Sequence, residues 1–187
     1  MPAPTQPTVI ILASGRGERF RASGGTVHKL QALLAGRPVL QHVLDAVQGS
    51  GLPWHLEDAG HPGMGDSIAA AVRAVPDAAG WLILPADLPL VRTETLQRVA
   101  AMLVEQDTVD AVQPTYGRER GHPVAFSARC RAALLRLSGS QGAAPVIKTL
   151  RVEGRTLDVE VDDIGVVTDV DTVDDLARAE RLISAWR

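Results

Sequence analysis

The chain has 187 residues, of which 45% are hydrophobic, and its formal net charge at pH 7 is −3. This length and apolar content suffice to bury one sizeable core, so we expect a single domain over residues 1–187. Acidic and basic residues are mixed along the chain, which argues against dedicated binding to nucleic acid or to a membrane surface. Cys130 is the only cysteine, no stretch reads as a membrane span, and the N-terminus lacks a secretory signal, so we expect a cytoplasmic protein.

The first predicted element is a buried strand over residues 9–12, which ends in the loop Ala13-Ser14-Gly15-Arg16-Gly17-Glu18-Arg19-Phe20. Two glycines let the backbone bring its N–H groups close to an anion, and Arg16 and Arg19 add positive charge. Between Arg16 and Arg37 the basic residues are opposed only by Glu18. The pattern predicts a phosphate site, although a strand-to-helix turn with solvated arginines is the plain alternative.

Two common phosphate-binding loops do not fit this stretch. A dinucleotide fingerprint needs glycine at the sixth position of G-x-G-x-x-G, where this chain has Phe20. The spacing G-x-x-x-x-G-K-[ST] of a P-loop does not occur in the chain.

Strands and helices alternate along the rest of the chain. The patterns first predict a helix from Pro38 to about Gly49, an edge strand over residues 54–58, a helix capped by Asp66, a strand over 81–84 and a helix capped by Thr93. They then predict strands at 111–113 and 124–126, a helix over about 127–137, a short helix after Gly142, a strand over 157–161 and a strand end at 166–171. A final helix is predicted to run to about Ala185, with Thr172 and Asp175 as a capping box. Alternation of this kind predicts an α/β sandwich with a mainly parallel sheet that binds ligands at the carboxyl ends of its strands.

Three aspartates follow predicted strands. Asp87 lies between Pro85 and Pro89 directly after the strand over residues 81–84, and a carboxylate held there suits Mg²⁺. Asp169 and Asp171 share one face if their segment is extended, so one or both could reach the same cation. The alternatives are a turn aspartate at position 87 and an aspartate that supports the last helix at position 171.

His122 precedes Pro123 at the start of a predicted strand. An imidazole there could contact a substrate group, and an exposed loop histidine is an equal alternative. The serines do not pair with a histidine and an acid as a hydrolase would require, and the other histidines lack metal-ligand spacing.

Six stretches, taken in order, resemble the MobA-like nucleotidyltransferases, and most closely their molybdenum cofactor cytidylyltransferase branch. They are residues 12–20, His28-Lys29-Leu30, Gly63-Met64-Gly65-Asp66-Ser67, Pro85-Ala86-Asp87-Leu88-Pro89-Leu90, Gly121-His122-Pro123-Val124 and Asp169-Val170-Asp171-Thr172. The resemblance covers nearly the whole chain and implies a Rossmann-like three-layer fold that binds a nucleoside triphosphate and Mg²⁺.

By this resemblance, catalytic, nucleotide, metal and acceptor roles fall on particular residues. Arg16, Lys29 and Asp87 are expected to be catalytic. Nucleotide-binding residues are Leu12, Ala13, Ser14, Gly15, Arg16, Gly17, Arg19, Lys29, Gly65 and Ser67. Asp87 and Asp171 are expected to hold the metal, with Asp169 as an alternative to Asp171, and His122 and Pro123 are expected to lie toward the acceptor.

The chain also departs from the family pattern. Between Asp45 and Trp54 there is room only for a helix end and a turn, so the fold is expected to be one βα unit shorter than is usual for the family. The long loop over residues 21–27 contains Gly24 and Gly25 and suggests a flap over the triphosphate.

The implied reaction transfers a nucleoside monophosphate from CTP to the phosphate of molybdopterin or its molybdenum form and releases pyrophosphate. GTP is the alternative donor, and a sugar or alcohol phosphate is an alternative acceptor. A molybdoenzyme or its chaperone is the protein partner that this reading implies. Two other classes stay open: a glycosyltransferase that uses Asp169 and Asp171, and a non-catalytic nucleotide-binding protein.

Overall fold

The computed structural model describes residues 5–186, so the first part of the proline-rich N-terminus, residues 1–4, lies outside the described residues. The strands are β1 (Thr8–Leu12), β2 (Leu33–Leu34), β3 (Arg37–Pro38), β4 (Trp54–Glu57), β5 (Gly80–Pro85), β6 (Ala111–Tyr116), β7 (Glu119–Arg120), β8 (Val124–Ser127) and β9 (Thr156–Glu160). The helices are α1 (Glu18–Ala22), α2 (Val39–Ser50), α3 (Met64–Ala74), α4 (Thr93–Glu105), α5 (Arg131–Leu135), α6 (Ala144–Val152) and α7 (Val173–Ala185), with short 3-10 turns η1 (Lys29–Gln31), η2 (Ala128–Cys130) and η3 (Ile164–Val167).

The main sheet has the strand order β4-β1-β5-β8-β6-β7, and β9 pairs with β6, while β2 and β3 form a separate hairpin. β1 runs parallel to β4 and β5, β9 runs parallel to β6, and β8 runs antiparallel to both β5 and β6. Within the main sheet, only β8 and the short β7 therefore oppose the common direction. The predicted α/β sandwich with a mainly parallel sheet is confirmed.

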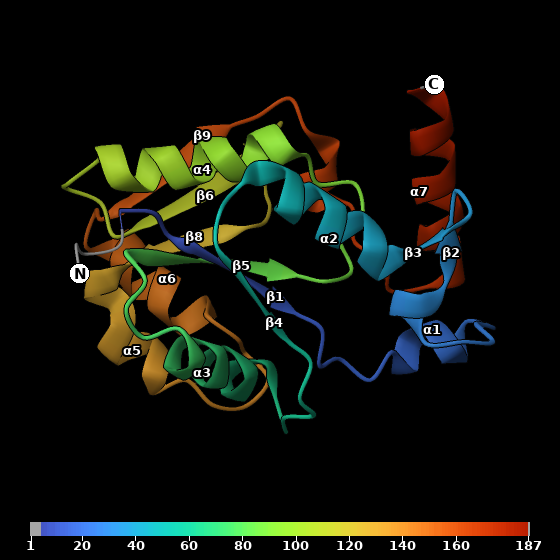
Figure 1. Ribbon diagram of the computed structural model, residues 1–187, viewed down its shortest axis with the longest axis horizontal. Helices are drawn as coiled ribbons and strands as arrows, with labels where there is room; N and C mark the ends of the chain where they lie inside the picture. The colour runs from blue at the N-terminus through green and yellow to red at the C-terminus, as the bar shows by residue number, and fades with distance from the viewer. Residues whose placement is uncertain (1–4, 187) are drawn as a thin grey trace.

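Helices cover both faces of the main sheet (Figure 1). Successive side chains of a strand point to opposite faces, and β1 is buried on both. Val9 and Ile11 pack into the core that includes residues of α2, α4 and α7, whereas Ile10 and Leu12 pack into the core that includes residues of α3, α5 and α6. This two-sided burial explains the continuous apolar run of the first strand.

Local signals account for the two ends of α2 and the start of α7. α2 follows Pro38 and ends at Gly51, which has a φ of 70°, a conformation that glycine adopts without steric cost. α7 begins with the predicted capping box, because Thr172 accepts from the backbone N–H of Asp175 and the Asp175 carboxylate accepts from that of Thr172. No helix within residues 5–186 has the length and apolarity needed to cross a membrane.

The structure corrects two predicted helix caps. α3 begins at Met64 after an extended Gly63, so Asp66 lies inside the first turn and its carboxylate accepts from the backbone N–H of Gly139 instead. Thr93 is the first residue of α4 rather than its cap, and its hydroxyl donates to the carbonyl of Ala46 on α2. Both side chains form hydrogen bonds with backbone groups that are distant in sequence.

Two other predicted elements differ in form. The helix expected over residues 127–137 is a 3-10 turn, η2, followed by the short α5. The strand end expected at residues 166–171 is instead the end of η3 followed by irregular chain. The backbone N–H of Val170 donates to the carbonyl of Asp87 at 2.9 Å, so this segment lies next to the turn after β5 without forming a strand.

The segment between α2 and α3 is short, as the sequence indicates. Residues 51–63, all of which the structure describes, contain β4 as their only regular element. β4 ends the strand order of the main sheet and pairs directly with β1 in parallel. The strand that leads into the glycine loop, β1, is therefore the direct neighbour of the edge strand β4.

Candidate active site

A cavity of about 800 Å³ opens at the carboxyl ends of β1 and β5. This size lies within the usual range for small-molecule sites. Its lining includes residues 12–20, Lys29, residues 61–64, Ser67, Asp87, residues 119–122, Asp169 and Asp171. The cavity thus brings together residues from all six stretches that carry the family resemblance.

Backbone hydrogen bonds explain how distant segments meet at this cavity. The N–H of Ala86 donates to the carbonyl of Leu12 at 3.0 Å, which places Asp87 beside the glycine loop. Because β8 runs antiparallel to β5, the residues that precede it arrive at the same edge of the sheet. The N–H of His122 then donates to the carbonyl of Val166 at 2.9 Å, which closes this side of the cavity.

The glycine loop is anchored by two polar contacts. Nε2 of His28 lies 2.8 Å from the carbonyl oxygen of Gly15, and Nδ1 of the same ring accepts from the backbone N–H of Leu30. Since Nδ1 accepts, Nε2 carries the proton and donates to Gly15. The second contact joins the loop to α3, where the hydroxyls of Ser14 and Ser67 lie 2.7 Å apart.

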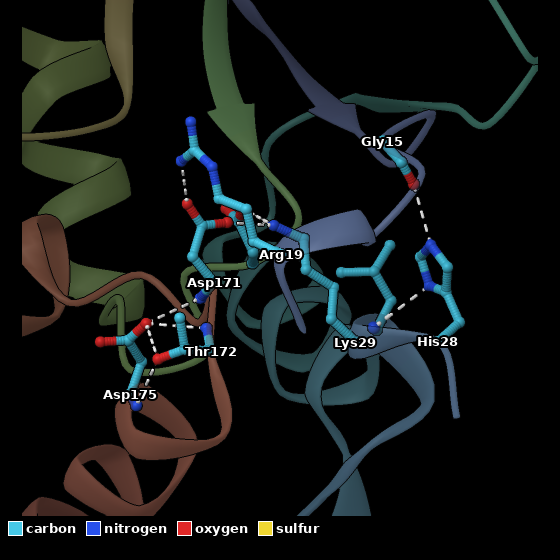
Figure 2. Close-up of polar contacts among 9 residues, drawn as sticks. Gly15, Arg19, His28, Lys29, Asp171, Thr172 and Asp175 are labelled. Carbon is cyan, nitrogen blue, oxygen red and sulfur yellow. Dashed lines mark hydrogen bonds and ion pairs between the residues drawn. The ribbon is translucent and has the colours of Figure 1, made fainter. Parts of the chain in front are cut away.

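The central feature of the cavity is an ion network between Lys29 and two carboxylates (Figure 2). Nζ of Lys29 lies 2.6 Å from Oδ2 of Asp87 and 2.7 Å from Oδ1 of Asp171. Nη1 of Arg19 lies 2.9 Å from the other oxygen of Asp171. The sequence predicted Lys29, Asp87 and Asp171 as site residues, and the structure brings all three into direct contact.

The charges of this network stabilise one another. Burial alone would lower the pKa of Lys29, but the carboxylates of Asp87 and Asp171 raise it above its ordinary value. Burial of Asp171 acts to raise its pKa, but hydrogen bonds and charge from Lys29 and Arg19 hold that pKa below its usual value. Both groups therefore stay charged at neutral pH.

The donor set fits a divalent cation. Among residues 5–186 no group of three or more histidine, cysteine or acidic side chains could hold a metal ion. Asp87 and Asp171, however, already converge on a single cation, the ammonium of Lys29. Mg²⁺ is commonly held by one or two protein carboxylates together with water and substrate phosphates, so two carboxylates suffice here.

Asp169 and His122 line the same cavity, and the charge of Asp87 acts on both. Burial, and then the negative charge of Asp87, raise the pKa of the Asp169 carboxyl. Burial lowers the pKa of the His122 imidazole, although the charge of Asp87 opposes this shift. His122 is therefore a neutral ring near neutral pH, able to donate through one nitrogen and accept through the other.

Two of the predicted site residues do not line the cavity. Gly65 is buried, and its N–H donates to the carbonyl of Gly139 at 2.8 Å. A Cβ on Gly65 would lie 2.8 Å from backbone atoms of Ser138, so this glycine permits close packing of α3 against that loop. Pro123 is buried and follows a cis peptide bond, which turns the chain from His122 into β8.

Several cavity residues escaped the sequence reasoning. Nε2 of His61 lies 3.1 Å from Oε1 of Glu57, whose side chain is only 9% exposed, and His61 lines the cavity next to Gly63 and Met64. The spacing of four residues between Glu57 and His61 was the available signal, but it is also common in helices and loops. Arg120 lines the opposite side and pairs with Asp158 at 2.8 Å, a contact between β7 and β9 that only the fold brings about.

Comparison with known proteins decides the family. The sequence profile of the MobA-like NTP transferase domain matches residues 45–159, more than half of the chain. The chain belongs to the MobA-like NTP transferase family. The MobA-like family predicted from the sequence is thereby confirmed.

The chain is also similar to individual curated proteins. The bifunctional protein GlmU of Stenotrophomonas maltophilia is 35% identical over 147 residues, a match that covers 61% of this chain and 30% of that protein. The chain thus spans about a third of the length of this curated relative.

Solved structures of other proteins share the fold. The Mycobacterium tuberculosis protein Rv0371c superposes with a TM-score of 0.76 at 24% identity, over 97% of this chain and 100% of the other, and it has also been solved as a complex with manganese. Molybdopterin-guanine dinucleotide biosynthesis protein A from Archaeoglobus fulgidus superposes with a TM-score of 0.63 at 17% identity, over 95% and 99% of the two chains. These likenesses confirm the Rossmann-like arrangement.

Proposed function

We propose that this MobA-like protein transfers CMP from CTP to the terminal phosphate of molybdopterin, or of its molybdenum form, with release of pyrophosphate. One observation carries the transfer chemistry: Asp87 and Asp171 converge on one cation directly beside the glycine loop. A loop that cradles phosphates next to paired carboxylates is what a metal-assisted attack on a nucleoside triphosphate requires.

In the proposed mechanism a phosphate oxygen of the acceptor attacks the α-phosphorus of CTP, and the bond from that phosphorus to the bridging oxygen of pyrophosphate breaks. A phosphomonoester is largely ionised at neutral pH because its second pKa is about 6, so no side chain has to remove a proton. The rate then depends on positioning and on neutralising charge.

The basic residues of the loop have the task of binding the triphosphate. The N–H of Ala13 already donates to the carbonyl of Glu57, so in this proposal the backbone N–H groups of residues 14–17 bind the triphosphate, while Leu12 and Ala13 line the cavity beside it. Lys29 and the exposed side chains of Arg16 and Arg19 would stabilise the departing pyrophosphate. Ser67, whose hydroxyl lies beside that of Ser14, is assigned to the ribose or base of the nucleotide. Asp87 and Asp171 would hold Mg²⁺, which supplies charge neutralisation at the α-phosphate.

The acceptor is assigned to the side of the cavity formed by residues 119–122. His122 is neutral and able to donate a hydrogen bond to an acceptor oxygen, and its backbone is held by the hydrogen bond to Val166. Pro123 is assigned to the same side because it directly follows His122. A fold relative named for molybdopterin-guanine dinucleotide biosynthesis supports an acceptor of the molybdopterin type. It also keeps GTP as the alternative donor.

The proposed product suggests a protein partner and a cellular compartment. A molybdoenzyme or its chaperone is the partner that would receive the finished cofactor. The reducing environment of the cytoplasm suits a chain whose one cysteine, Cys130, is a buried free thiol.

The test is pyrophosphate release with each of the four ribonucleoside triphosphates and Mg²⁺, with and without molybdopterin. We expect release that depends on molybdopterin and occurs with CTP alone. Release with GTP alone would preserve the mechanism and reverse the donor. Release of a nucleoside diphosphate from a nucleotide sugar would identify a glycosyltransferase, and triphosphate binding without turnover on any phosphate acceptor would identify a binding protein.

A further inference from the structure

The position of Lys29 raises a specific problem for metal binding. The Lys29 side chain is 12% exposed, and its ammonium contacts one oxygen from each of the carboxylates of Asp87 and Asp171, at 2.6 and 2.7 Å. Arg19 occupies the second oxygen of Asp171 from the solvent side, where its own side chain is 81% exposed. The two carboxylates therefore already have cationic partners.

A divalent cation and the ammonium cannot share this place. A cation held by Oδ2 of Asp87 and Oδ1 of Asp171 would take the volume between these oxygens, which Nζ of Lys29 occupies. With metal–oxygen bonds of about 2.1 Å, an Mg²⁺ ion in that volume would overlap Nζ, and the two positive charges would repel each other. Binding of the cation thus requires Lys29 to leave.

We propose that Lys29 is a resident counter-ion of the two carboxylates, which a divalent cation displaces when it binds. The exchange keeps the two half-buried carboxylates neutralised in the free protein, where an unpaired charge with little access to water would be costly. It also delivers a freed ammonium to the glycine loop, where the triphosphate would accept it. This last step rests on the proposed function, whereas the exchange itself does not.

The same exchange explains why one lysine serves two purposes. Lys29 belongs to η1, whose first residue it is, and η1 is tied to the glycine loop through the contact between His28 and Gly15. An ammonium on a four-carbon stem can move several ångströms by rotamer changes while its backbone stays fixed. No movement of the sheet or the helices is needed.

The first experiment measures Mn²⁺ binding without any nucleotide, from the electron paramagnetic resonance signal of the free ion. The chain contains two lysines, Lys29 and the exposed Lys148 of α6, so Lys148→Met is a matched control. We expect Lys29→Met to bind Mn²⁺ at least about tenfold more tightly than the wild type, and Lys148→Met to match the wild type. Equal or weaker binding by a folded Lys29→Met protein would overturn the proposal.

Removing Lys29 leaves two carboxylates close together, so the variant is less stable without metal. Thermal unfolding therefore provides a second measurement. We expect saturating Mn²⁺ to raise the melting temperature of Lys29→Met more than that of the wild type. An equal rise in both proteins would contradict an exchange, because only the wild type has to give up its ion pairs.

The second experiment follows the lysine itself. The wild type is treated with an acylating reagent, and mass spectrometry of its peptides gives the rate at which each lysine reacts. This compares the ion-paired Lys29 with the exposed Lys148 in the same molecule. We expect Lys29 to be protected without metal and to react faster at saturating Mn²⁺, while Lys148 is unchanged. Protection of Lys29 that persists at saturating Mn²⁺ would refute displacement.

These measurements separate the two proposals. All three measurements use the metal alone, so a wrong nucleotide donor or acceptor does not affect their outcome. Pyrophosphate release with no lysine exchange would refute only the exchange, and lysine exchange with no pyrophosphate release would refute only the transferase assignment.

Discussion

Nε2 of His28 donates to the carbonyl oxygen of Gly15 across 2.8 Å and ties the segment that carries Lys29 to the glycine loop. Figure 2 shows this contact beside the ion network. We expect His28→Ala to weaken binding of nucleoside triphosphate, because the loop loses its anchor, and to lower the free energy of unfolding by about 1 kcal/mol. Calorimetric titration and urea denaturation measure the two effects.

The chain offers a matched control for this variant. Nε2 of His42 lies 2.8 Å from the carbonyl oxygen of Leu34, a contact of the same kind that lies away from the cavity. His42→Ala should lose similar stability and keep its triphosphate affinity. If both variants lose affinity equally, the role of His28 is one of general stability.

His61 marks the end of the cavity where we expect the base of the nucleotide, beside Gly63 and Met64. His61→Ala should weaken CTP binding about threefold to tenfold, as loss of one hydrogen bond would. Binding of tripolyphosphate, which has no base, should not change. Comparison of the two ligands by titration checks this, and an equal loss for both would place His61 at the phosphates instead.

His122 predicts a pH dependence of stability. Burial lowers its pKa below the ordinary value of 6.5, so between the two values the unfolded chain binds more protons than the folded protein. The free energy of unfolding should therefore fall as the pH drops below 6.5. In His122→Gln this contribution should be missing when urea unfolding is compared at about pH 7.5 and about pH 5.5. The same pH slope in both proteins would contradict the assignment.

Gly65 predicts a purely steric effect. Its Cβ position lies 2.8 Å from backbone atoms of Ser138, so Gly65→Ala should lower the free energy of unfolding by about 1–3 kcal/mol. Gly60 has open space around its Cβ position, and Gly60→Ala should change stability by less than about 0.5 kcal/mol. Thermal denaturation of both variants tests whether the packing of α3 against the loop is as close as described.

Local patterns in the sequence are enough to predict much of this fold. The apolar run of β1, the apolar faces of α2 and α4, and the capping box of Thr172 and Asp175 are each written within a few consecutive residues. Asp66 was misplaced because the start of α3 depends on a distant contact: Gly63 and Gly65 pack against residues 138–139. A Cβ at either glycine would meet that backbone, and nothing near Asp66 reveals it.

For the site, too, residue types can be predicted from the sequence, whereas contacts between distant residues cannot. The residue types of Lys29, Asp87 and Asp171 indicate phosphate and metal chemistry, and the family pattern selects them among other charged residues. The sequence predicts that Asp87 and Asp171 can reach one cation, but it does not predict that this cation is the ammonium of Lys29. Lys29 and Asp171 are 142 positions apart, and a hydrogen bond from Val170 to Asp87 helps to place the two aspartates together. Without that geometry, the occupation of the carboxylates by an ammonium stays hidden.

The most direct test of the central claim uses CTP labelled with radioactive phosphorus at the α-position and measures where the label goes. With Mg²⁺ and molybdopterin, the wild type should move the label into the acceptor and release unlabelled pyrophosphate. Asp87→Asn should do so at least about 100-fold more slowly, since several kcal/mol of charge stabilisation depend on the cation. Asp45→Asn, which alters a surface carboxylate paired with Arg37, should match the wild type. Undiminished label transfer by a folded Asp87→Asn protein would contradict the account.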